Sequence, residues 1–183
     1  RICYEQGIEV TSLPGAAACI TALTLSGLPT RRFSFEAFLP KEKKERAAVL
    51  EELKNDTRTL IVYEGTQQLL GTLKELQNAL GDRRLTVCRE LTKKFETAFQ
   101  TTFSEAIRYY EEQGVRGECV LVIEGRSREE LVQEAQQSWE AISVEEHMEH
   151  YLSTGMDRKS AMKQVAKDRG VGKREIYQML LNA

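Results

Sequence analysis

Four short groups of residues in this chain combine glycines, small side chains and carboxylates in a way that suits the binding of a small ligand. Each group adjoins an apolar run that predicts a strand, and in α/β sheets the ends of strands commonly form the ligand crevice. Taken singly each group is a turn, and Glu64 and Glu90 can each be a structural carboxylate in an ion pair. The groups are Pro14-Gly15 with Ala17 and Ala18, Tyr63-Glu64, Glu90-Leu91, and Gly117-Glu118.

Several other chemistries have no support in the sequence. There is no G-x-S-x-G, no G-x-G-x-x-G after a strand and no P-loop. His147 and His150 are the only histidines, three residues apart on a predicted helix. Two ligands without a third are more typical of surface histidines than of a zinc site, so we expect no metal. A nucleophile paired with a histidine is not expected either.

The elements that must position these groups alternate between short apolar runs and amphipathic helices. This order favours an α/β fold with a mixed sheet flanked by helices. The alternating run Ile8-Glu9-Val10 predicts a first strand, and Pro14-Gly15 after it is expected to open a helix of small residues that Gly27 ends. A packed corner without a ligand is the alternative for that segment. The predicted strands are Phe33–Phe35, Thr59–Tyr63, Leu85–Cys88, Phe99–Phe103 and Cys119–Ile123, and the predicted helices between them are Gln67–Leu80 and Ser104–Gln113.

After Gly125 the strand pattern stops and the remaining sequence predicts helices only. Ser127 and Ser143 are each followed three residues later by Glu, which is a helix-start signal. The turn at Gly170-Val171-Gly172 separates two short helices with helix-turn-helix spacing. We therefore expect an α/β domain over residues 1–125 and a helical extension over residues 126–183.

Composition limits the classes of function. The net charge of −2 over 183 residues gives no global attraction to nucleic acid, so any such attraction must be local. The four widely spaced cysteines are expected to be small buried hydrophobes in a reducing, cytoplasmic compartment. No apolar run is long enough to span a membrane, and there is no signal peptide. The start at Arg1, without Met, suggests a fragment of a longer protein.

In combination, a series of segments resembles the C-terminal half of the tetrapyrrole-methylase superfamily. The resemblance covers about residues 1–125, and the helical tail is similar to a short extension found in some members. The segments, in order, are Pro14-Gly15, Gly27-Leu28-Pro29, Phe35–Pro40, Leu60–Glu64, Gly81–Arg84, Arg89–Lys93 and Gly117–Gly125.

The resemblance implies an S-adenosylmethionine-dependent methyltransferase that holds its cofactor between two α/β domains. The most similar members methylate a ribose 2′-hydroxyl of small-subunit ribosomal RNA. Cofactor contacts would fall on Pro14, Gly15, Ala17, Ala18, Tyr63, Glu64, Glu90, Leu91, Gly117 and Glu118. The N-terminal domain of such enzymes is absent from this sequence, so we expect the fragment alone to be inactive and to bind the cofactor weakly or not at all.

Two departures from the family pattern stand out. Ala17 replaces a common serine, and Tyr63-Glu64-Gly65-Thr66-Gln67-Gln68 lacks the histidine and arginine that usually follow the Tyr-Glu pair. No catalytic base is identified, although Glu36, Glu64 and Glu90 are candidates.

RNA binding requires local positive charge. The candidates are Lys41, Lys43, Lys44, Arg46, Lys93, Lys94, Lys173 and Arg174. For Lys41 to Arg46, a salt-bridged helix start is an equal alternative. The resemblance also implies a homodimer, with ribosomal RNA as partner.

Two other functions remain open. One is a stand-alone nucleic-acid-binding module that uses the terminal helix-turn-helix, and the other is methylation of a small tetrapyrrole-like substrate.

Overall fold

The computed structural model describes residues 1–181 and divides into two compact units, residues 1–125 and residues 126–183. Asn182 and Ala183, which the sequence analysis placed in the helical extension, lie outside the described residues. Each unit has its own hydrophobic core.

The first unit is built on a five-stranded mixed sheet with strand order β1-β2-β5-β3-β4. The parallel pair is β1–β2, whereas β5 runs antiparallel to β2 and β3, and β4 runs antiparallel to β3. The bounds are β1 Phe33–Phe38, β2 Thr59–Glu64, β3 Arg84–Arg89, β4 Thr97–Thr102 and β5 Cys119–Ile123. The mixed α/β fold expected from the sequence is confirmed.

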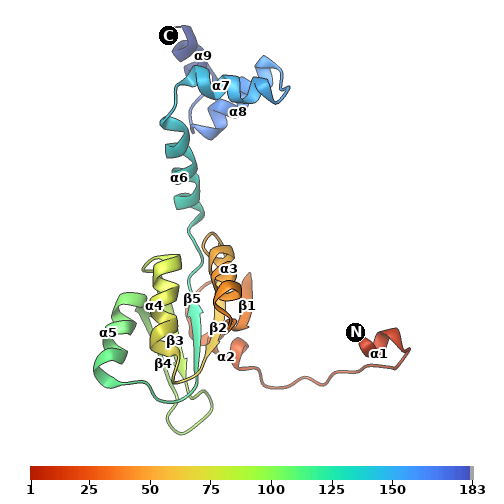
Figure 1. Ribbon diagram of the computed structural model, residues 1–183, viewed down its shortest axis with the longest axis vertical. Helices are drawn as coiled ribbons and strands as arrows, with labels where there is room; N and C mark the ends of the chain where they lie inside the picture. Colours follow the sequence, from red (N-terminus) through yellow and green to blue (C-terminus); the bar gives the residue numbers. More distant parts are fainter. Residues whose placement is uncertain (182–183) are drawn as a thin grey trace. The chain divides into compact units, whose positions relative to one another are not determined.

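Helices cover the sheet on both faces. On one face lie α3 (Lys43–Leu53), α4 (Leu69–Leu80) and α5 (Phe103–Gln113), with α4 next to both others (Figure 1). These helices bury every second side chain of the strands, the ones that point toward them, including Leu60, Val62 and Leu121. On the other face the short helix α2 (Ala18–Leu25) packs on Ile61 and Val122. All five residues of the central strand β5 are buried, which fixes the register of its neighbours.

The N-terminal segment differs from the prediction. After the short helix α1 (Ile2–Glu5), residues 8–17 contain neither helix nor strand and are all exposed. The expected strand at Ile8–Val10 is wrong because no described strand pairs with it to satisfy its backbone groups. The expected helix start at Pro14-Gly15 is also wrong. The helix begins at Ala18, since Ala17 has the extended geometry of a cap residue (φ −131°, ψ 116°).

The second unit contains α6 (Arg128–Glu140), α7 (Val144–Ser153), α8 (Arg158–Asp168) and α9 (Lys173–Leu181). Its core joins α7, α8 and α9 through side chains such as Met148, Val165 and Ile176. The turn between α8 and α9 passes through Gly170 at φ 65°, a conformation that glycine adopts readily.

His147 corrects the expectation of surface histidines. Its side chain is fully buried and stacks on Trp139, with ring centroids 3.8 Å apart and planes 5° apart. Arg169 Nε donates a hydrogen bond to His147 Nδ1 (3.1 Å). Within residues 1–181, no group of three or more His, Cys, Asp or Glu side chains is arranged to hold a metal ion.

The cysteines are all free in the structure. Cys88 and Cys119 are buried as expected, but Cys3 is exposed because the segment around it has no core to pack against. Across residues 1–181 there is no helix with the length and apolarity that a membrane crossing requires.

Candidate functional site

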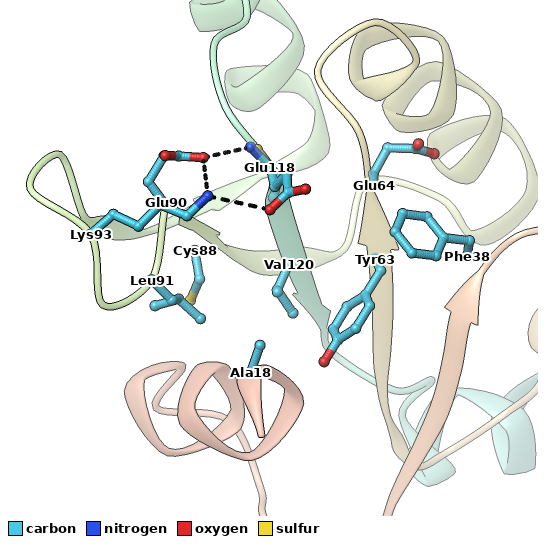
Figure 2. A pocket seen from close by; sticks show the side chains of 11 residues that line it. Ala18, Phe38, Tyr63, Glu64, Cys88, Glu90, Leu91, Lys93, Glu118 and Val120 are labelled. Carbon is cyan, nitrogen blue, oxygen red and sulfur yellow. Dashed lines mark hydrogen bonds and ion pairs between the residues drawn. The ribbon is translucent and has the colours of Figure 1, made fainter. Parts of the chain in front are cut away.

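Three strand ends surround a cavity of about 300 Å³ in the first unit (Figure 2). Since β2 and β3 both run antiparallel to β5, their carboxyl ends meet the amino end of β5. Glu64 and Arg89 therefore both lie opposite Cys119. Of the predicted cofactor residues, Ala18, Tyr63, Glu64, Glu90, Leu91 and Glu118 line this cavity.

The remaining wall residues are Phe38, Cys88, Lys93, Cys119 and Val120. From the sequence, Lys93 is expected only as an RNA contact, and the other four wall residues are not predicted for this site. Strand alternation was the available signal for Cys88 and Val120, because both point to the same sheet face as Tyr63.

Glu90, Lys93 and Glu118 form a polar cluster at the mouth of the cavity (Figure 2). Glu90 Oε1 accepts hydrogen bonds from the Glu118 backbone N–H (2.9 Å) and from Lys93 Nζ (3.2 Å). The Glu118 amide and then Lys93 lower the pKa of Glu90, and Glu90 followed by Glu118 raises the pKa of Lys93. Both side chains therefore carry their charges at neutral pH.

The loop after β3 is held in a strained conformation beside the cavity. Glu90 (φ 51°) and Thr92 (φ 66°) are non-glycine residues in the left-handed region. Gly117, at φ 79°, packs against Glu90 so closely that a Cβ there would lie 2.6 Å from Glu90 Cγ. Such strain is typical of ligand sites, where surrounding contacts must maintain it.

Glu64 is anchored from behind by α4. Its Oε1 accepts from the Gly65 backbone N–H (2.8 Å), and its Oε2 accepts from the Thr72 hydroxyl (2.6 Å). Thr72 Oγ1 in turn accepts from Arg46 (2.8 Å), which also binds Glu75. Arg46, a candidate for RNA binding, thus uses its guanidinium within the fold.

Aromatic side chains form the wall of the cavity beside β1. Tyr63 packs edge-on against Phe35 and Phe38, with centroids 5.0 and 5.7 Å away. Phe38 is 64% exposed, so this wall offers apolar area to a ligand. Burial raises the pKa of Tyr63, with Cys19 adding to the effect.

The other predicted residues are placed differently. Pro14, Gly15 and Ala17 are exposed and do not line the cavity. Gly117 supports Glu90 from outside the cavity. The RNA candidates Lys41, Lys43, Lys44, Lys94, Lys173 and Arg174 are all exposed.

A comparison with known protein families identifies the family of this chain. Residues 1–107, more than half of the chain, match the family model "Tetrapyrrole (Corrin/Porphyrin) Methylases". The chain belongs to this family.

Curated relatives narrow the comparison. A ribosomal RNA small subunit methyltransferase I from Halalkalibacterium halodurans is 45% identical over 173 residues, covering 94% of this chain and 59% of the relative. The protein of the same name from Bacillus subtilis is 46% identical over 171 residues, covering 93% of this chain and 58% of the relative. The chain thus spans about three fifths of the length of the relatives it matches.

A solved structure shows the same fold. The X-ray structure of cobalt precorrin-4 methyltransferase, a cobalamin biosynthetic enzyme, matches with a TM-score of 0.50 at 18% identity. The match covers 67% of this chain and 55% of that chain.

Proposed function

We propose that the chain belongs to an enzyme that transfers a methyl group from S-adenosylmethionine to a ribose 2′-hydroxyl of small-subunit ribosomal RNA. The observation that carries this proposal is the single cavity that gathers predicted cofactor residues from α2, β2, the loop after β3 and the loop before β5. The relatives named above support the choice of substrate.

The residues around the cavity fit part of such a cofactor. Leu91, Cys88 and Val120 offer an apolar wall for a flat base, and Ala18 leaves room opposite them. Glu118 places a carboxylate at the rim for hydroxyl or amino groups, whereas the Glu64 carboxylate turns away from the cavity toward α4. At about 300 Å³, the cavity is at the lower end of the range for ligand sites, which agrees with its forming one wall of a larger cleft.

When bound, the cofactor supplies a methyl group on a positively charged sulfonium. The residues of this chain bind and orient, and in such a transfer alignment supplies a large part of the rate. Glu90 is a poor candidate for a base, since the Glu118 amide and Lys93 lower its pKa. Glu64 is engaged by Thr72 and Gly65, and Glu36 accepts from the Ser34 hydroxyl.

RNA would approach over the exposed lysines of α3 and of the loop after β3. Lys43 and Lys44 lie in the first turn of α3, and Lys94 lies above the Phe95 ring, 5.6 Å from its centroid. Binding at this surface would depend strongly on salt, because phosphate contacts release counterions. The homodimer and the cytoplasmic location implied by the resemblance are part of this proposal.

A second candidate function is nucleic-acid binding through α8 and α9 alone. It is favoured by Lys173 and Arg174, which are both exposed in the first turn of α9. In that position they resemble the basic start of a recognition helix.

The cofactor proposal is tested by amide NMR of the chain during titration with S-adenosylhomocysteine, a method that detects weak binding. We expect shifts at Leu91, Glu118 and Ala18, and we expect Ala18→Trp to remove them by filling the cavity. Ala47→Trp, an exposed alanine on α3, is the matched control and should bind as the unaltered chain does. Shifts confined to residues outside the cavity, or cavity shifts that Ala18→Trp leaves unchanged, would refute the proposal.

A further inference from the structure

A second cavity, of about 310 Å³, lies between the paired ends of β3 and β4 and the carboxyl end of α5. Its walls include Arg89, Phe99, Tyr109, Tyr110 and Arg116. Neighbouring residues of a strand point to opposite faces, so Cys88 faces the first cavity while Arg89 faces this one. Both cavities therefore open at the same end of β3.

The Tyr110 hydroxyl lacks a partner in this cavity wall. Tyr110 is 4% exposed, and no hydrogen bond to its hydroxyl is present within the described part of the chain. A buried hydroxyl without a partner is costly, but this oxygen is covered by the fold, so a ligand in the cavity would contact the edge of the Tyr110 ring and not its hydroxyl. Burial raises the pKa of Tyr110, and the hydroxyl therefore stays neutral.

The charge of the cavity is positive. Arg89 and Arg116 both line it, and none of its lining residues is acidic. Arg89 uses part of its guanidinium to donate to Thr97 Oγ1 (3.2 Å) and to the Arg116 carbonyl (3.4 Å). The Arg116 side chain is exposed and makes no hydrogen bond or ion pair with any described residue. It is available for an anion such as a phosphate.

Aromatic rings stand beside these charges. Phe99 and Tyr109 have centroids 5.4 Å apart, and Tyr109 is 49% exposed. An adjoining hollow, also lined by Arg89 and Arg116, adds Phe95, which is 67% exposed. Rings alternating with arginines are the combination that binds unstacked bases and their phosphates in single-stranded RNA.

We propose that this second cavity binds one nucleotide of single-stranded RNA, with the base against Tyr109 and a phosphate at Arg116. The inference rests on the proposed function, since it supplies a binding point for RNA at the same sheet end as the cofactor cavity. The volume suits one nucleotide, and a recess suits a base outside a helix, because duplex RNA is read along its groove.

The test measures binding of a short fluorescein-labelled single-stranded RNA to the full chain by fluorescence anisotropy over a range of salt concentrations. Tyr110→Phe should leave both binding and thermal stability unchanged, because it removes only a covered hydroxyl without a partner. Tyr109→Ala should weaken binding about tenfold through lost stacking. Arg116→Glu should also lower the salt slope by about one contact. Arg128→Glu, an exposed arginine on α6, is the matched charge control and should leave binding unchanged.

The outcomes separate this inference from the proposed function. RNA binding that neither Tyr109→Ala nor Arg116→Glu changes would overturn this inference alone. Absence of RNA binding by the unaltered chain would count against both, whereas the titration with S-adenosylhomocysteine tests the cofactor proposal independently. If Arg116→Glu instead abolishes self-association of the chain in sedimentation, the cavity is a contact between copies and the RNA inference is wrong.

Discussion

Gly117→Ala should damage both the stability of the first unit and the cofactor cavity. Gly117 adopts φ 79°, a region that alanine rarely enters. Its added methyl carbon would lie 2.6 Å from both Cγ and Oε1 of Glu90. The Cγ atom is close to the backbone, so Glu90 cannot relieve the overlap by moving only the end of its side chain.

The size of the effect follows from the backbone. A left-handed conformation costs an L-residue about 1–2 kcal/mol, and this is a lower bound before the overlap with Glu90 is included. For a chain of this length, that corresponds to a fall in Tm of about 2–8 °C. Displacing Glu90 also breaks its hydrogen bond to the Glu118 N–H, which holds the loop after β3 against β5.

Thermal unfolding followed by circular dichroism measures the first effect, and the S-adenosylhomocysteine titration measures the second. Gly71→Ala is the matched control, because Gly71 lies in α4 with open space around it. There the substitution should stabilise the chain by about 0.5–1 kcal/mol. A Gly117→Ala chain with unchanged Tm and unchanged ligand shifts would refute the assigned role of this glycine.

Three further predictions concern other parts of the chain. Arg46→Ala should destabilise the first unit by about 1–2 kcal/mol, because it breaks bonds to two side chains and a carbonyl, whereas Lys43→Ala should change stability by less than about 0.5 kcal/mol in urea unfolding. Gly125→Ala should lower Tm further than Gly117→Ala, since its Cβ would press on rigid backbone; unfolding followed by circular dichroism checks this. Burial, and then Arg169, lowers the pKa of His147, so the unfolded chain binds more protons just below about pH 6.5 and the helical unit should lose stability there as pH falls. Fluorescence of Trp139, the only tryptophan, reports this loss, and His147→Phe should remove it.

The sheet was predictable because its strands carry unusually strong signals. The three inner strands are short apolar runs bounded by glycine or charged residues, and the central residues of all three are buried. Their relative order is not encoded in any one segment. The strand ends indicated a ligand crevice, and the resemblance indicated which residues meet there. It is the antiparallel placement of β5 between β2 and β3 that brings the ends together.

Other features depended on neighbours that no local pattern reveals. Ile8 and Val10 alternate as in a strand, but a strand requires a partner, and none of the described strands pairs with them. His147 carries the same local signal as a surface histidine, yet Trp139 from the preceding helix covers it. The Tyr110 hydroxyl gave no signal at all, because an unpaired polar atom is defined by the atoms around it.

The loop after β3 begins beside residues that line both cavities. Cys88 and Arg89, adjacent in the chain, face the first and second cavities respectively, and Glu90 begins the strained turn that follows. A shift of the backbone at Glu90 that moves its neighbour Arg89 would therefore alter both cavities. Binding on one face that favours the left-handed turn at Glu90 should favour binding on the other, since both ligands would stabilise the same backbone conformation. Affinity for single-stranded RNA measured with and without saturating S-adenosylhomocysteine tests this coupling. Equal affinities would show that the loop is already fixed in the free chain and transmits nothing between the two cavities.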